Sequence, residues 1–134
     1  MILLDTCAVI WIVNRDSIVP EAARAIRRAS AEGSLFVSPV SAWEIGMLTR
    51  RGRLTLSVPP EIYVAHIFAH PGVRIADLTP EIAVGASYLP GRFHEDPADR
   101  LLVSTALSAG LRILTRDRRI LDYAAAGHVP VIRC

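Results

Sequence analysis

Residues 94–117, HEDPADRLLVSTALSAGLRILTRD, carry the clearest structural pattern in the sequence. Asp96-Pro97 has the form of a helix start, in which a capping residue precedes proline at the first helical position. Gly110 is a typical helix end, and residues 111–114 form a short apolar run that predicts a buried strand. The segment therefore predicts a helix followed closely by a strand, as in an α/β protein.

Similar helix and strand signals alternate along the rest of the chain. Apolar runs predict further strands at residues 2–4, 35–37, 73–76 and 129–132. Helix starts, marked by capping residues or proline, are predicted near Thr6, Pro20, Ser41, Pro60, Pro80 and Asp117. Short, fully apolar strands joined by helices are typical of parallel sheets covered on both faces. We therefore expect an α/β fold, a three-layer α/β/α sandwich with a mostly parallel central sheet.

Length and composition limit the class of protein. A chain of 134 residues fits a single domain over residues 1–134, and 51% hydrophobic with 21% charged residues excludes a disordered chain. The longest uncharged stretch, residues 62–73, is too short to cross a bilayer. The N-terminus lacks the basic start of a secretion signal, and two cysteines are too few for a disulfide framework. We therefore expect a cytoplasmic protein.

Two acids follow predicted strands. Asp5 comes directly after the strand at 2–4, and Asp117 comes shortly after the strand at 111–114. The carboxyl ends of parallel strands lie at one edge of the sheet, and α/β folds bind ligands at that edge. We therefore expect both carboxylates near a functional site.

Two further acids lie on helix faces that are otherwise apolar. Asp99 precedes Leu102 and Val103 by three and four residues, and Glu44 has apolar residues at the same spacings. Burying a carboxylate costs on the order of several kcal/mol unless it is paired or bound to metal. The chain has no lysine to neutralise these acids. A divalent cation would do so, and oxygen-only ligands suit Mg²⁺ or Mn²⁺.

Each of these acids also fits an ordinary role at the start of a helix. The expected caps are Asp5, Asp117, Asp96 with Asp99 in the first turn, and a capping box of Ser41 with Glu44. The two interpretations are compatible, because a side chain near a helix N-terminus can still bind a metal.

The histidines, cysteines and large aromatic residues do not form a recognisable site. His66 and His70 are four residues apart but lack a third metal ligand, and the two nucleotide-phosphate motifs are absent. We expect packing or surface roles for the others: Cys7, Trp11, Phe36 and Trp43 in the core, His94 on the surface, and Cys134 uninvolved.

Four segments occur in an order that resembles a known family. They are MILLDT at residues 1–6, SAWEI at 41–45, HEDPADRLL at 94–102 and LTRD at 114–117. With these segments the chain resembles PIN-domain ribonucleases over essentially its whole length, in particular the VapC-type toxins of bacterial toxin–antitoxin pairs. The resemblance implies a PIN-like sheet between helices, and an acidic quartet that binds Mg²⁺ or Mn²⁺.

The resemblance also implies a role for each acid in these segments. The main metal ligands would be Asp5 and Asp99, and the other catalytic acids would be Glu44 and Asp117. The supporting residues would be Thr6, Thr115 and Asp96, the last favoured as a cap by the proline that follows it.

The implied function is Mg²⁺-dependent cleavage of RNA phosphodiesters by the toxin of a toxin–antitoxin pair. The substrate would be RNA, such as tRNA or another structured RNA, and the protein partner a cognate antitoxin. A mean hydropathy of +0.36 and the resemblance also indicate a homodimer. Two alternatives stay open: a PIN-domain nuclease of RNA processing without an antitoxin, and a non-catalytic RNA-binding module.

The charge distribution suits an RNA substrate. All 15 basic residues are arginine, and the formal net charge is +2. Without the four acids of the quartet, the chain has 15 basic and 9 acidic residues, a net charge of +6. Arginines cluster at residues 24–28 and 50–53, and Arg116, Arg118 and Arg119 flank Asp117, which makes these three the candidate RNA contacts.

Overall fold

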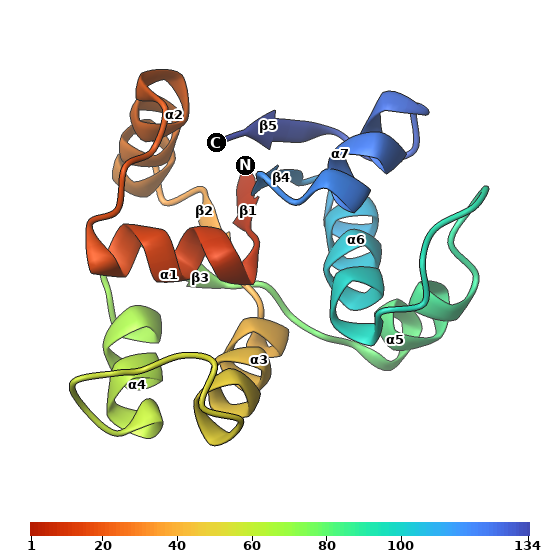
Figure 1. Ribbon diagram of the computed structural model, residues 1–134. Coiled ribbons are helices and arrows are strands. Elements are labelled where there is room, and N and C mark those ends of the chain that lie inside the picture. The colour runs from red at the N-terminus through yellow and green to blue at the C-terminus, as the bar shows by residue number, and fades with distance from the viewer.

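The computed structural model describes all residues, 1–134, and contains seven helices around a five-stranded sheet (Figure 1). The strands are β1 (Ile2–Leu4), β2 (Leu35–Val37), β3 (Arg74–Ile75), β4 (Arg112–Thr115) and β5 (Val131–Arg133). The helices are α1 (Thr6–Asn14), α2 (Pro20–Ala31), α3 (Pro39–Arg50), α4 (Pro60–Phe68), α5 (Pro80–Ser87), α6 (Pro97–Ala109) and α7 (Arg118–Ala125). The predicted alternation of strands and helices is confirmed.

The sheet is parallel throughout, with the strand order β3-β2-β1-β4-β5. β1 lies at the centre, where Leu4 is in register with Val37 of β2 and with Leu114 of β4. The chain adds strands on one side of β1 and then returns to add β4 and β5 on the other side. The topological switch point therefore lies between β1 and β4, which is where α/β folds bind their ligands.

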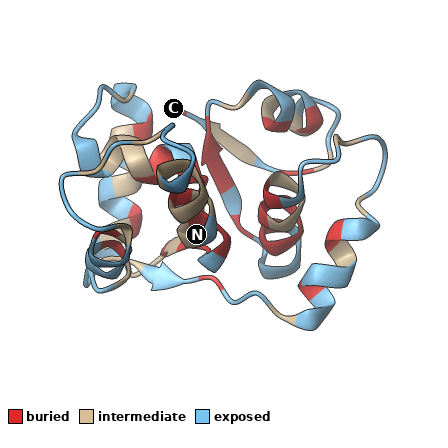
Figure 2. Cartoon of the chain, turned by 60° about the horizontal axis from the view of Figure 1, so that its bottom comes forward, coloured by how far each residue is buried: buried red, intermediate tan, exposed pale blue.

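The side-chain alternation of the strands builds one core on each face of the sheet. Ile2 and Leu4 pack with α1, α2, α3 and α4, whereas Leu3 and Ile113 pack with α6 and α7. Figure 1 shows the first four helices on one side of the sheet and α5, α6 and α7 on the other. Buried residues lie on the strands and on the inward sides of the helices (Figure 2). The expected three-layer arrangement is therefore present.

Helix starts follow from proline and capping residues. Five of the seven helices begin at proline, whose fixed φ suits the first helical position. At α3 the structure corrects the prediction: Ser38 is the N-cap, its Oγ accepts from the Val40 N–H at 3.1 Å, and Pro39 begins the helix. Ser41 therefore lies within the helix, where it is buried, and the predicted capping box with Glu44 is wrong.

Three strands each carry an exposed arginine, although the sequence pattern predicts fully apolar strands. Arg74, Arg112 and Arg133 are exposed strand residues, so the strands are not fully apolar. β3 and β5 are the two edges of the sheet, and an edge strand keeps one side open to solvent. Cys134, expected to be uninvolved, is buried in the core on the α1–α4 face of the sheet, at 6% exposure.

The helices are all short, the longest being α6 with 13 residues, which ends at Gly110 with φ +63°. None of them combines the length and the apolar character that a bilayer crossing requires.

The central strand offers a test of this packing. Leu3 is fully buried in β1, and Leu3→Ala should lower the free energy of unfolding by about 2–5 kcal/mol, because it removes contacts and leaves a cavity. Urea denaturation measures the loss. Leu107→Ala, at a position that is 38% exposed on α6, is the control and should cost less than about 1 kcal/mol. Equal losses in the two variants would contradict the described core.

Candidate functional site

The carboxyl ends of β1 and β4 bring two acids to the switch point. Asp5 directly follows β1, and its backbone N–H donates to the Leu114 carbonyl of β4 at 3.2 Å. Asp117 follows β4 by two residues and caps α7, where its Oδ1 accepts from the Arg119 N–H at 2.8 Å. The two neighbouring strands therefore deliver both carboxylates to one edge of the sheet.

Asp5 is a buried carboxylate held by two donors. Its Oδ1 accepts from the Ala8 N–H at 2.6 Å, and its Oδ2 accepts from the Thr115 hydroxyl. Thr115 Oγ1 in turn accepts from the Asp117 N–H at 2.9 Å. Burial raises the pKa of Asp5, and the hydrogen bond from Thr115 opposes this. Asp5 is therefore both the N-cap of α1 and an acid fixed at the floor of the site.

Glu44 reaches the same region from α3. The Thr6 hydroxyl, in the first turn of α1, donates to Glu44 Oε2 and lies 3.0 Å from Ser41 Oγ. Burial raises the pKa of Glu44, and the charges of Asp96 and Asp5 raise it further. The pKa of Glu44 is therefore affected by the acids that cap α1 and α6, although both lie far from Glu44 in the sequence.

Asp99 lies in the first turn of α6, with its side chain 20% exposed. Burial raises the pKa of Asp99 to about 7, and the charges of Asp96, Asp117 and Glu44 raise it in the same direction. Asp96, the exposed N-cap of α6, accepts from the Ala98 and Asp99 N–H groups at 3.0 and 3.3 Å. These effects link Asp5, Glu44, Asp99 and Asp117 electrostatically, and we call these four acids the acidic cluster.

Comparison with known proteins places the chain in a family. A model of the PIN domain matches residues 2–126. The chain belongs to the PIN-domain family. It is 34% identical over 123 residues to Ribonuclease VapC22 of Mycobacterium tuberculosis, covering 91% of each chain.

Solved structures share the fold of this PIN domain. A chain of VapBC2 from Rickettsia felis, bound to a DNA fragment from the promoter, aligns with a TM-score of 0.70 at 12% identity and covers 99% of this chain and 98% of that one. A chain of FitAcB from Neisseria gonorrhoeae aligns with a TM-score of 0.58 at 22% identity and covers 98% and 96%. These likenesses confirm the predicted PIN-like fold.

His94 is a residue of this PIN domain that the sequence analysis treated as surface. Its Nε2 is buried and lies 3.0 Å from Asp99 Oδ2, and its Nδ1 accepts from the Asp96 N–H at 3.3 Å. Nδ1 also lies 3.2 Å from Arg119 Nη1, so the proton of the neutral ring is assigned to Nε2, facing Asp99. Burial lowers the pKa of His94, and Arg119 lowers it further. The sequence signal for this role is that His94 lies two residues before Asp96 and five residues before Asp99.

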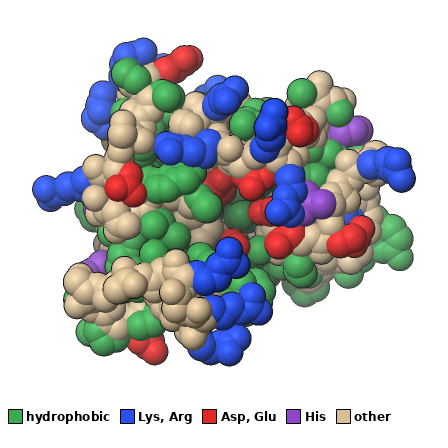
Figure 3. All heavy atoms as spheres, in the orientation of Figure 1, with side chains coloured by type: hydrophobic (Ala, Val, Ile, Leu, Met, Phe, Trp, Pro, Cys, Tyr) green, Lys and Arg blue, Asp and Glu red, His purple; other side chains and the backbone are tan.

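The three candidate RNA-contacting arginines have different environments. Arg116 stacks on the Trp11 ring, with its guanidinium carbon 3.7 Å from the ring centre, and donates to the Ser17 carbonyl at 3.1 Å. Arg119 contacts His94, and all three arginines are exposed. Figure 3 shows acidic side chains at the centre of one face with arginines around them. Arg119 therefore borders the acidic cluster beside His94, while Arg116 packs on Trp11 of α1 and its charge lowers the pKa of Asp5.

Two residues expected in the core are exposed. Trp43 is 55% exposed on α3, next to Glu44, because the inward face of this helix is formed by Val40, Ser41 and Ile45. Cys7 is exposed in the first turn of α1. Trp11 and Phe36 are partly buried and pack against the cores, as expected.

The donor set of the acidic cluster fits a hard divalent cation. All its ligand atoms are oxygens, and none of its acids forms an ion pair with arginine. No three His, Cys, Asp or Glu side chains converge closely enough to form a complete protein-ligand set. An ion held by one or two of these carboxylates would keep water ligands, which is the usual arrangement for Mg²⁺.

The raised pKa of Asp99 predicts a stability that falls with pH. Between its ordinary value of 3.8 and about 7, the folded protein binds more protons than the unfolded chain, so the unfolding free energy falls as pH rises through this range. Asp99→Asn removes the carboxylate that causes this fall. It should raise the free energy of unfolding by about 1–3 kcal/mol at pH 8, and by much less at pH 4, where Asp99 is protonated in the folded protein. Urea denaturation in EDTA measures both.

The control for this prediction is Asp122→Asn, which removes an exposed acid on α7. It should leave the pH dependence unchanged. An Asp99→Asn variant whose stability followed the parent protein at both pH values would contradict the environment described for Asp99.

Proposed function

We propose that this PIN-domain chain is a Mg²⁺-dependent endoribonuclease and the toxin of a toxin–antitoxin pair. The observation that carries the proposal is the acidic cluster at the switch point between β1 and β4. The similarity to Ribonuclease VapC22 over 91% of the chain supports the same activity. Cleavage of RNA phosphodiesters is a reaction for which carboxylates and a divalent ion are suited.

In the proposed site, Asp5 and Asp99 hold the metal ion, and Glu44 and Asp117 complete the acidic cluster. When bound, the ion supplies positive charge that stabilises the phosphoryl oxygens and makes a nearby water more acidic. Two hydrogen bonds fix the orientation of the Asp5 carboxylate. The Thr115 hydroxyl donates to Oδ2, and the Ala8 N–H of α1 donates to Oδ1.

The remaining residues position these carboxylates. The Thr6 hydroxyl fixes Glu44 through its donated hydrogen bond. Asp96 caps α6 and so holds the first turn that carries Asp99. Asp117 keeps one oxygen on the N–H groups that start α7, so its other oxygen is available to orient a water molecule.

We further propose that a cognate antitoxin is the protein partner. A mostly apolar groove of about 530 Å³ lies between α1, α2 and α4, and none of the four acids lines it. Its residues include Val9, Ile12 and Ile26, with Arg27 and His66 among the polar ones. An exposed apolar groove of this kind is typical of a protein-binding surface. The VapBC2 structure, whose chain shares this fold, is bound to a DNA fragment from its promoter.

A homodimer is part of the same proposal. Val84 and Tyr88, four residues apart at α5, are 62% and 82% exposed, which favours coverage by a second copy. The genome distinguishes the two candidate functions. A neighbouring gene for a short DNA-binding protein would favour a toxin, and its absence would favour a PIN-domain nuclease of RNA processing that has no antitoxin.

Neutral replacements of the proposed metal ligands should remove cleavage and keep the fold. Asp5→Asn and Asp99→Asn should each lower kcat/KM for RNA by a factor on the order of 10³, equivalent to about 4 kcal/mol. Asparagine is a good N-cap, so Asp5→Asn preserves the start of α1. Gel-based cleavage assays measure the rates, and Asp122→Asn is the charge-matched control. Both ligand variants retaining Mg²⁺-dependent cleavage would refute the assignment.

Removal of divalent ions should stop the reaction. EDTA should abolish cleavage, Mg²⁺ or Mn²⁺ should restore it, and Ca²⁺ should not, because its larger and more flexible coordination suits this chemistry poorly. Titration calorimetry should detect Mg²⁺ binding that Asp5→Asn weakens. Full activity in excess EDTA would refute the metal requirement, and absence of both metal binding and cleavage would favour the non-catalytic RNA-binding module.

A further inference from the structure

The outward face of α3 carries a large aromatic ring without a partner inside the chain. Trp43 is 55% exposed, whereas the other tryptophan, Trp11, is covered by the Arg116 guanidinium. The remaining aromatic contacts join Phe93, Tyr123, His94 and His128, or place Arg74 over Phe36. The Trp43 side chain therefore stays largely open to solvent, one residue before Glu44 of the acidic cluster.

This ring borders a cleft of about 440 Å³, which we call the α3 cleft. Its lining residues are Ala42, Trp43, Gly46, Met47, Arg50 and Arg51. Trp43, Met47 and Arg50 are spaced four and three residues apart, so they share one face of the helix. The lining contains two arginines and no acid.

Gly46 forms the floor of the cleft, although packing does not require a glycine there. A Cβ built at Gly46 would meet no atom within 4 Å, and the residue lies in the interior of α3. Glycine at such a position destabilises a helix by about 1 kcal/mol relative to alanine. Gly46, with Ala42 and Arg50, also lines a second cleft of about 610 Å³ between α3 and α4.

We propose that the α3 cleft binds a nucleotide of the RNA strand next to the bond that is cleaved. The base stacks on Trp43 and packs against Met47, and Arg50 with Arg51 binds the adjoining phosphates. This inference rests on the proposed function, since it assumes an RNA substrate. It adds a subsite outside the acidic cluster, with preference for unpaired RNA, because only an unpaired base exposes its face to stacking.

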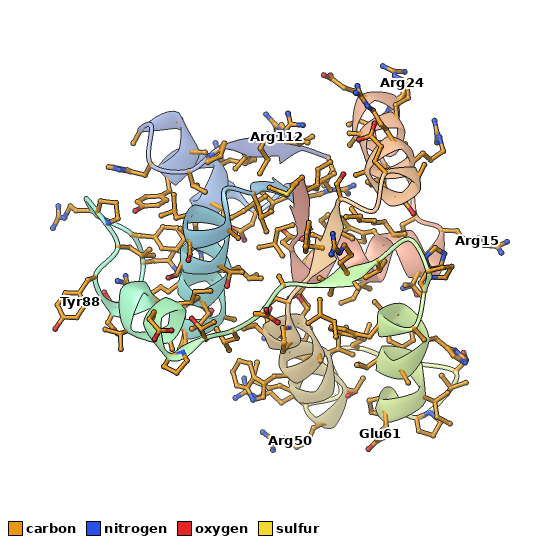
Figure 4. All side chains as sticks on the ribbon, turned by 180° about the vertical axis from the view of Figure 1, so that it is seen from behind. Arg15, Arg24, Arg50, Glu61, Tyr88 and Arg112 are labelled. Atoms are coloured by element: carbon orange, nitrogen blue, oxygen red, sulfur yellow. The ribbon has the colours of Figure 1, made fainter.

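The position of the cleft supports this assignment. The rise of an α-helix places Arg50 about 9 Å along α3 from Glu44, so a strand at the acidic cluster can continue over Trp43 to the arginines. Figure 4 shows Arg50 projecting at the end of α3 that points away from the sheet. On the face shown in Figure 3, arginines lie over this part of the molecule beside the acidic side chains.

A second copy of the chain is the competing occupant of the same surface. A two-fold interface brings one patch against its own copy, so the positive charges of Arg50 and Arg51 would be brought toward those of the second copy. Like charges placed this way disfavour association, whereas an RNA phosphate backbone is complementary to them. The charge of the cleft therefore favours RNA.

The first test uses binding without cleavage. In an Asp5→Asn background, a short single-stranded RNA should bind about 10-fold more weakly to Trp43→Ala, whereas Trp43→Phe, which keeps a stacking ring, should stay within about 3-fold of the parent. Leu107→Ala, which removes an exposed apolar side chain elsewhere, is the matched control. Circular dichroism should show an unchanged fold, because Trp43 is largely exposed. Equal affinity for Trp43→Ala and its parent would overturn the inference.

The second test observes the ring directly. Trp11→Phe leaves Trp43 as the only tryptophan, and the single-stranded RNA should quench its fluorescence, whereas a duplex of the same sequence should quench it less. Replacing Arg50 and Arg51 by Gln should weaken RNA binding. It should also reduce the slope of log K against log salt concentration by about 0.7 for each phosphate contact that is lost. Arg24 and Arg27, replaced in the same way, are the controls. Unquenched fluorescence would overturn the inference.

Two further measurements separate this inference from its competitors. With Asp5 restored, Trp43→Ala should raise KM for single-stranded RNA about 10-fold and leave kcat nearly unchanged. If RNA cleavage is normal in Trp43→Ala but sedimentation shows loss of a dimer, the cleft is a protein interface. Failure of the proposed function is a different result, in which the unaltered chain does not cleave RNA in Mg²⁺ or Mn²⁺.

Discussion

A buried carboxylate at the junction of the two central strands is the constraint on which the rest of the structure depends. Asp5 closes β1, caps α1 through the Ala8 N–H and accepts from Thr115 at the end of β4. The same Thr115 oxygen accepts from the Asp117 N–H at the start of α7. The two strand ends and the two helix starts are therefore tied to one side chain, and a shift of either strand would disturb both helices.

This arrangement concentrates negative charge that the chain itself does not neutralise. Burial raises the pKa of Asp5, Glu44 and Asp99, and neighbouring acids raise it further. Hydroxyls and a backbone N–H donate to Asp5 and Glu44, and His94 Nε2 faces Asp99, while Arg116 is engaged with Trp11 and the Ser17 carbonyl. The cluster thus lowers stability at neutral pH, as functional sites often do, and a bound cation would offset that loss.

Local sequence signals predicted the elements well but not the environment of single residues. Proline, capping residues and apolar runs predicted the strands and most helix starts, since these signals act within a few residues. The start of α3 was missed because Ser38, not Ser41, accepts from the first free N–H of the helix, and Pro39, which has no N–H, occupies the first helical position. His94 and Trp43 were misjudged for a different reason: their exposure depends on which helix faces are covered by distant parts of the chain.

The sequence by itself determined the α/β class, the parallel sheet and the four motif segments, because periodicity and capping are local and segment order is explicit in the chain. Only the tertiary structure decided that β4 lies beside β1, which brings Asp5, Asp117, Asp99 and Glu44 into mutual electrostatic range. It also decided that Asp99 faces His94, and that the outer face of α3 stays open. These features arise from strand order and helix packing, where residues far apart in sequence compete for the same space.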